Sequence, residues 1–223
     1  MTTTNTDHLV VVAHTLAQGA QWCERTLGVA PGPGGKHALM GTHNRLLAIG
    51  SAAHPLAYLE IIAIDPDAPA PARSRWFGMD ALALQAAVRE QPRLVHVVAR
   101  TTQLEMLRWG LVVLGVDAGV PVAAARDTPQ GRLAWRIQLR DDGAIDRHFA
   151  LPTLIEWQGQ HPAESMPASP VRLQSVQAGG MPEAVAALLQ WRGLTHVRAA
   201  APAWHVKLET PLGEAALSSW KAD

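Results

Sequence analysis

Four side chains that can bind a metal ion lie in segments that otherwise have the composition of buried strands. Glu60 interrupts the apolar run YLEIIAID, and Glu156 interrupts LPTLIEWQG. His8 and His96 each stand in a valine-rich segment, DHLVVV and RLVHVVAR. Burying an ionised carboxylate without a partner is costly, so each glutamate should face solvent, meet a cation or bind a metal. The choice depends on whether the fold brings the four residues together.

An internal repeat relates these residues in pairs. Residues 7–29 and 93–116 both contain a Trp, four further residues and then Leu-Gly-Val. Each copy begins with a short strand that carries one histidine and continues into a helix that ends at Gly28 or Gly115, where glycine suits a left-handed cap. Strand-like stretches follow the cap in both copies. The pattern predicts the order β-α-β-β-β twice, with a histidine on each first strand and a carboxylate on each last strand.

The repeat divides the chain into four segments. We expect a first βαβββ module over residues 1–66, a linker with a short helix over 67–92, a second βαβββ module over 93–160 and a partial third module, βαββ(β), over 168–223. The first strand of the third module has no histidine, and its last strand has no acid in its apolar stretch. This module is therefore expected to pack on the other two without contributing a ligand.

The composition is that of a folded protein with a sizeable core, since 48% of the 223 residues are hydrophobic. Nineteen basic and nineteen acidic residues cancel without forming a basic cluster, which argues against nucleic acid or an anionic membrane as a partner. The polar start MTTTNTDH lacks the form of a secretion signal, and no apolar stretch is long enough to span a bilayer. We expect a cytoplasmic protein, with the single Cys23 packed in a helix rather than reactive.

Taken together, these motifs resemble the vicinal oxygen chelate superfamily, which includes glyoxalase I, extradiol dioxygenases, methylmalonyl-CoA epimerase and fosfomycin-resistance enzymes. More narrowly, GGKHALMGTHNRLLAIG followed by YLEIIAID is similar to the glyoxalase-like domain group within it. The resemblance covers residues 7–160 and, more loosely, the C-terminal remainder. It implies an α+β fold in which paired βαβββ modules form a curved, half-barrel-like mixed sheet, with the inward residues of both first strands and both last strands at one centre.

The same resemblance implies that His8, Glu60, His96 and Glu156 are the ligands of a divalent metal ion. Two imidazoles and two carboxylates suit Zn, Ni, Co, Mn or Fe(II). Such an ion polarises a carbonyl and stabilises an enediolate, and Glu60 or Glu156 would serve as the catalytic base once displaced from the ion. We therefore expect a metal-dependent lyase or isomerase of glyoxalase type. The alternatives are an Fe(II) extradiol-type dioxygenase and a metal-free protein that sequesters a small molecule.

Residues in the stretch that carries the resemblance are candidates for substrate binding. They are His37, His43, Asn44 and Arg45. An arginine would hold an anionic substrate group through a bidentate pair. The candidates for such a grip are Arg45, Arg73, Arg75 and Arg100. The expected partner is a small oxygenated molecule, and because both modules of one cleft lie in this chain, a monomer or a homodimer would be functional.

Overall fold

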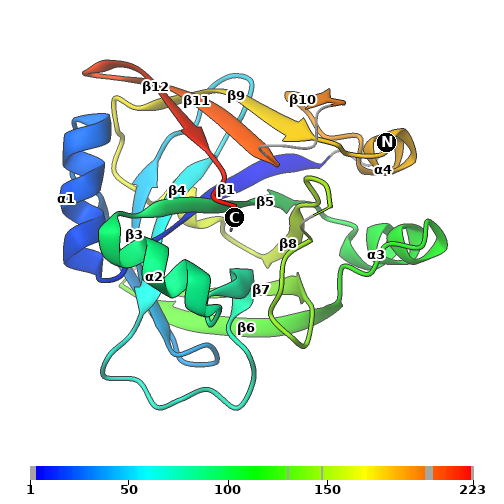
Figure 1. The fold of residues 1–223 in the computed structure, drawn as a ribbon, viewed down its shortest axis with the longest axis horizontal. Coiled ribbons are helices and arrows are strands. Elements are labelled where there is room, and N and C mark those ends of the chain that lie inside the picture. The colour runs from blue at the N-terminus through cyan, green and yellow to red at the C-terminus, as the bar shows by residue number, and fades with distance from the viewer. Residues whose placement is uncertain (1–3, 130, 147, 199–202, 222–223) are drawn as a thin grey trace.

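The computed structural model describes residues 4–129, 131–146, 148–198 and 203–221, and its elements follow one another as three βαβββ units (Figure 1). The first unit contains β1 (Asn5–Val12), α1 (Leu16–Leu27), β2 (Gly32–His37), β3 (Thr42–Ala48) and β4 (Tyr58–Ile64). A linker carries the 3₁₀ turn η1 (Trp76–Gly78) and α2 (Leu82–Glu90). The second unit contains β5 (Arg93–Arg100), α3 (Leu104–Val113), β6 (Val120–Thr128), β7 (Gly131–Leu139) and β8 (Thr153–Gln158). After the 3₁₀ turn η2 (Pro162–Glu164), the third unit contains β9 (Arg172–Gly179), α4 (Glu183–Leu189), β10 (Leu194–Val197), β11 (Trp204–Thr210) and β12 (Gly213–Ser218).

The strands form two sheets. The first two units together build an eight-stranded mixed sheet with the order β2-β3-β4-β1-β5-β8-β7-β6, and the third unit builds a four-stranded sheet with the order β10-β9-β11-β12. The large sheet curves until its two edge strands, β2 and β6, contact each other, while the small sheet lies across its outer side (Figure 1). The predicted α+β fold with paired βαβββ modules in a curved mixed sheet is confirmed.

Strand alternation gives the large sheet two apolar faces. The outer face packs against α1, α3 and the small sheet, through residues such as Leu59 and Ile61 of β4. The inner face packs against η1 and α2, through residues such as Val10, Ile62 and Ile155. Because successive side chains of a strand point to opposite faces, a polar residue on the inner face is surrounded by core. Any polar side chain there needs a partner.

The first helix ends at the predicted glycine, and α3 ends two residues before Gly115. The hydroxyl of Thr15 accepts a hydrogen bond from the backbone N–H of Gln18 and caps α1, and Gly28 ends the helix in a left-handed conformation with φ of 70°. Cys23 is fully buried in α1, and burial raises the pKa of its thiol to about 12, so the thiol is not a nucleophile. In the described part of the chain, the helices are all too short or too polar to span a membrane.

Two irregularities interrupt the antiparallel pairing of β1 with β5 at the centre of the large sheet. Thr6 pairs with Ala99 and His8 pairs with Val98, which leaves Asp7 as an extra residue in β1. Further along, the pairing shifts again and leaves Val95 of β5 without a counterpart. A bulge of this kind re-aims the neighbouring side chains and is common next to active sites. Each of the two predicted histidine ligands therefore lies beside a bulge.

Candidate active site

A small pocket lies on the inner face of the large sheet where the first two units meet; we call it the central pocket. Its polar side chains come from the first unit and are His8, His37, Asn44 and Glu60. Its other walls are largely aromatic or aliphatic and include Trp76, Phe77, Trp135, Ile155 and Trp157, with Arg126 at one side. Its free volume is about 30 Å³, which corresponds to ~2 water-sized atoms. Only a small reacting group fits there without movement of the walls.

Glu60 is the buried acid at the floor of this pocket, with 5% of its surface exposed. The side-chain amide of Asn44 donates a hydrogen bond of 2.6 Å to its Oε1. The Nε2 atom of His8 lies 3.5 Å from its Oε2, and the Nε2 atom of His37 lies 4.0 Å from Oε1. The carboxylate therefore faces neither solvent nor a lysine or arginine, and Oε2 remains open toward the pocket.

Asp7 orients His8 from behind. Its fully buried carboxylate accepts hydrogen bonds from His8 Nδ1 at 2.7 Å, from His161 Nε2 at 3.0 Å and from Trp157 Nε1 at 2.9 Å. Burial alone would raise the pKa of Asp7, but the hydrogen bonds from His161 and His8 outweigh it and hold the pKa well below its usual range. Because Nδ1 of His8 donates to an ionised carboxylate, Nε2 is the atom that faces Glu60.

His37 is a neutral neighbour of this group. Its pKa is lowered to about 3, first by burial and then by the positive charge of Arg126. Nδ1 of His37 lies 3.0 Å from the hydroxyl of Thr42, and its ring meets the edge of Trp76. At neutral pH it supplies a polar wall without adding a charge.

Two glycines let the backbone approach the pocket. The backbone N–H of Gly35 donates a 2.8 Å hydrogen bond to Oδ1 of Asn44. A Cβ atom at Gly34 would collide with Oδ1 of Asn44, and one at Gly35 would collide with the guanidinium of Arg126. The Gly-Gly pair of the motif is therefore needed to hold Asn44 and Arg126 in place.

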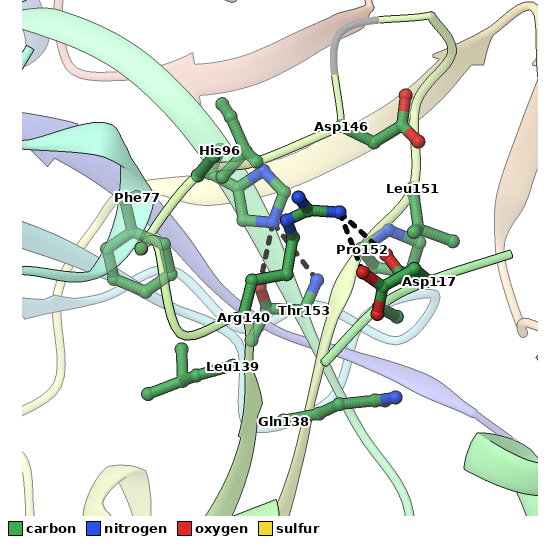
Figure 2. A pocket seen from close by; sticks show the side chains of 14 residues that line it. Phe77, His96, Asp117, Gln138, Leu139, Arg140, Asp146, Leu151, Pro152 and Thr153 are labelled. Atoms are coloured by element: carbon green, nitrogen blue, oxygen red, sulfur yellow. Dashed lines mark hydrogen bonds and ion pairs between the residues drawn. The ribbon is translucent and has the colours of Figure 1, made fainter. Parts of the chain in front are cut away.

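His96 and Phe77 both line a second cavity (Figure 2). The backbone N–H of Thr153 donates a 3.0 Å hydrogen bond to its Nε2, so the ring carries its proton on Nδ1, which has no partner among the described residues. Burial lowers its pKa to about 3, with a smaller contribution from His8. Phe77 lines both this cavity and the central pocket, which separates His96 from Glu60.

Glu156 lies on the opposite face of β8 from the central pocket. Its Oε2 is 3.8 Å from Nε of Arg136, and its Oε1 is 3.5 Å from the backbone N of Leu104 at the start of α3. The residues of β8 that face the pocket are its neighbours in sequence, Ile155 and Trp157. The alternation of the strand thus turns Glu156 away from His8 and Glu60.

The four side chains of the expected metal centre do not lie around one point in the structure. Of His8, Glu60, His96 and Glu156, the structure brings only the first two together. Within the residues that the structure describes, there is no group of three or more His, Cys, Asp or Glu side chains placed to hold a metal ion. The apolar Val98 lies opposite His8 on β5, where a second donor would be needed. The donor set of the second unit does not fit the metal that the superfamily implies.

The structure also separates the four predicted substrate-binding residues into two pairs. His37 and Asn44 line the central pocket. His43 and Arg45 point to the other face of the strands, where His43 lies 3.9 Å from Asp65 and Arg45 is exposed. One-residue alternation along β3 explains the split.

None of the four arginines proposed as an anion grip lines the central pocket. Arg73 and Arg75 are close to Asp141 and Asp80, and Arg100 donates to the backbone carbonyls of Thr6 and Pro55. The arginine that does face the pocket is Arg126 of β6, which the sequence reasoning missed. Along β6, Val122, Ala124 and Arg126 are partly buried while Ala123, Ala125 and Asp127 are exposed. This alternation of burial places Arg126 on the inner face, but the residue types in VAAARD do not alternate, so no sequence signal could have identified it.

Comparison with known proteins agrees with this architecture. A protein-family model described as "Glyoxalase-like domain" matches residues 6–193. A comparison with curated proteins finds no match. Among solved structures, a hypothetical protein from Staphylococcus aureus is similar with a TM-score of 0.60 and 16% identity, covering 98% of this chain and 87% of that one.

Two methylmalonyl-CoA epimerases are more distant matches. The enzyme from Mycobacterium tuberculosis has a TM-score of 0.40 and 12% identity over 73% of this chain and 92% of that one. The enzyme from Streptomyces coelicolor, in complex with 2-nitronate-propionyl-CoA, has a TM-score of 0.42 and 13% identity over 70% of this chain and 96% of that one. Likeness at this level concerns the fold alone. Because the family model matches most of the chain, the protein belongs to the glyoxalase-like domain family.

Proposed function

We propose that this protein is a glyoxalase-like isomerase that moves a proton between neighbouring carbon atoms of a small oxygenated substrate, with Glu60 as the base. The observation that supports this proposal is the buried pair of Glu60 and His8 at the floor of the central pocket, 3.5 Å apart. A general base must lie within reach of its proton in a site that excludes bulk water. The hydrogen bond from Asn44 fixes Oε1 and leaves Oε2 for the substrate.

The proposed reaction begins with an α-hydroxycarbonyl group in the central pocket. Oε2 of Glu60 takes the proton from the carbon that bears the hydroxyl, and the C–H electron pair becomes the C=C bond of an enediol. His8, protonated on both nitrogens, donates its Nε2 proton to the carbonyl oxygen, and the ionised Asp7 stabilises the imidazolium beforehand. The enediol hydroxyl then returns a proton to His8 as Glu60 protonates the other carbon. No oxidant is consumed.

This proposal replaces the metal-dependent form expected from the superfamily. The expected ion would have been held by four side chains, and His96 and Glu156 are engaged elsewhere, with the backbone of Thr153 and with Arg136. The residues that meet, His8 and Glu60, can act as acid and base by themselves. The proposed step is therefore carried by protein groups alone.

A second candidate function is supported by the aromatic walls of the pocket. The sequence has only 5% aromatic residues, which argues against a sequestering protein, but the fold gathers Tyr58, Trp76, Phe77, Trp135 and Trp157 around one pocket. Aromatic walls bind flat or apolar molecules without any reaction. Sequestration of a small molecule is therefore the alternative that an experiment must separate from catalysis.

The two functions differ in hydrogen exchange. In D₂O, an isomerase that acts through an enediol exchanges the carbon-bound proton of its substrate, and loss of the proton NMR signal measures the rate. A panel of α-hydroxycarbonyl and 2-oxo compounds would be tested with wild type, Glu60→Gln and Glu156→Gln. We expect Glu60→Gln to slow exchange at least ~100-fold and Glu156→Gln to leave it unchanged. Binding of a panel member to wild type without any exchange would instead favour sequestration.

A further inference from the structure

We infer that the natural ligand of the central pocket is a small carboxylate with an apolar tail, whose anionic group is bound by Arg126 and whose tail lies in a second, outer pocket. The inference rests on the proposed function, since it concerns the substrate of the same site. Three observations support it: Arg126 has no acidic partner among the described residues, it lines both the central and the outer pocket, and the other walls of the outer pocket are mostly apolar.

Arg126 is an arginine without an acidic partner. Among the described residues, no acidic side chain forms an ion pair with it, and its Nε is buried without a hydrogen-bond partner. Its recorded polar contact is from Nη1 to Oδ1 of Asn44, at 3.3 Å. A partly buried guanidinium loses hydration that a neutral amide only partly replaces, so an anion in the pocket would be bound strongly. The planar guanidinium matches a carboxylate through two parallel hydrogen bonds.

The charge of Arg126 acts inside the central pocket. It helps to lower the pKa of His37. Burial raises the pKa of Tyr58, and the charge of Arg126 opposes that rise. Asn44 stands between Arg126 and the base, because its Oδ1 accepts from the guanidinium while its Nδ2 donates to Glu60. The amide thus separates the cation from the carboxylate. Without it, a direct ion pair would neutralise both the anion site and the base.

Arg126 also lines an outer pocket with a volume of about 290 Å³. Its remaining walls are mostly apolar and include Pro33, Leu46, Leu133, Pro162 and Met166. Leu46 and Arg126 line both pockets, so the two cavities adjoin at these residues. The central pocket has only about 30 Å³ of free volume. The reacting carbonyl group fits inside, the carboxylate lies at the boundary, and an apolar substituent extends outward.

Binding of two matched probes tests the anion site. Phenylpyruvate carries the carboxylate, and its methyl ester has the same carbon skeleton without the charge. By isothermal titration, wild type should bind phenylpyruvate at least tenfold more tightly than the ester. Arg126→Gln should remove that preference, and Arg126→Lys should keep part of it because a point charge remains. Arg45→Gln, which changes an exposed arginine of the other face, is the control and should bind as wild type does.

The outer pocket is tested by the length of the probe. Pyruvate, which has no apolar tail, should bind wild type at least tenfold more weakly than phenylpyruvate. Met166→Gln should weaken the binding of phenylpyruvate and leave that of pyruvate unchanged, because Met166 lines the outer pocket and not the central one and glutamine adds no charge beside Arg126. Equal binding of pyruvate and phenylpyruvate would overturn the assignment of the tail.

The outcomes separate this inference from the proposed function. Glu60→Gln should keep the preference for phenylpyruvate over its methyl ester while losing exchange of the carbon-bound protons. If wild type binds the acid through Arg126 but exchanges no proton, the anion site stands and the isomerase proposal fails. If exchange occurs and Arg126→Gln exchanges as fast as Arg45→Gln, the isomerase stands and the anion site fails. Equal affinity of wild type for acid and ester, or no binding of either at 10 mM, roughly the weak limit for such ligands, also overturns the inference.

Discussion

The opening strands of the first two units each carry a buried histidine beside a bulge, but the hydrogen bonds of the two histidines differ. His8 donates from Nδ1 to the ionised Asp7 and presents Nε2 to Glu60. His96 accepts at Nε2 from the backbone N–H of Thr153. An imidazole with an anion behind it can hold a proton for catalysis, whereas one held by a backbone donor is kept neutral. The same topology thus gives the two histidines different hydrogen-bond environments.

The comparison extends to the walls around the two histidines. The first unit contributes the polar floor of the central pocket, and the second unit contributes Trp135, Ile155 and Trp157, with Arg126 as its charged group. Phe77 of the linker lines the cavities of both histidines, in a left-handed backbone conformation with φ of 58°. Such a conformation costs a non-glycine residue of order 1 kcal/mol and persists only where packing enforces it. The linker, which belongs to neither unit, keeps the two sites apart.

Replacing each histidine with the same residue gives the largest expected difference. We expect His8→Gln to slow proton exchange of a substrate by about 10²- to 10³-fold, because the group that protonates the carbonyl oxygen is lost. We expect His96→Gln to change the rate by less than threefold, since glutamine can still accept from Thr153 and His96 does not line the central pocket. Deuterium exchange of the substrate, followed by NMR, gives the rate for each variant and for wild type. Equal losses in the two variants would show that both histidines serve the reaction.

Asp7 is expected to contribute more to folding stability than any exposed carboxylate. Asp7→Asn leaves His8, His161 and Trp157 facing an amide, and we expect the free energy of unfolding at pH 7 to fall by about 3 kcal/mol. The folded pKa of Asp7 lies below its ordinary value of 3.8, so its contribution is complete above about pH 4 and is lost as the pH falls further. Urea unfolding at pH 7 measures the change. Asp142→Asn, at an exposed ion pair with Arg140, is the control and should cost less than about 1 kcal/mol.

The fold could be predicted from sequence because its signals are local. The strand, helix and terminal glycine of each of the first two units are encoded within about twenty residues, and the repeat predicts that these two units pair. His37, Asn44, His8 and Glu60 were predicted as site residues, and the structure places all four in one pocket. Each of them belongs to the first unit, where the motif is complete.

The second unit could not be predicted in the same way because a shift of one residue reverses the face of a strand. The spacing between the histidine and the tryptophan differs between the two copies of the repeat. Trp22 follows His8 by 14 positions, whereas Trp109 follows His96 by 13, so the counterpart of His8 is Val95. The positions of Asp7 and His161 could not be predicted from the sequence, because both depend on the assembled fold. Asp7 lies at a bulge, and His161 contacts it across 154 positions of the chain.

The two histidines should also differ in their effect on stability as the pH falls. The pKa of His96 is lowered from 6.5 to about 3, so its stabilising contribution is complete above pH 6.5 and is lost as the pH falls toward 3. We expect His96→Gln to reduce the slope of the free energy of unfolding between pH 6 and 4 by up to about 1.4 kcal/mol per pH unit. His37→Gln is a matched variant, because the pKa of His37 is also about 3. Urea unfolding at several pH values measures the slope, and parallel curves for wild type and His96→Gln would contradict the prediction.

The smallest expected effect concerns metal. Wild type, His8→Gln and His96→Gln would each be stripped, dialysed against Zn, Ni, Mn or Fe(II) and analysed for metal content. We expect each to hold well below one ion per chain, with no difference caused by His96→Gln, because His96 and Glu156 do not face His8 and Glu60. One ion per chain that is lost only in His8→Gln would indicate a site built by the first unit alone. One ion that is lost in both variants would mean that metal draws His96 past Phe77 into the central pocket, and the two histidines would then share one role.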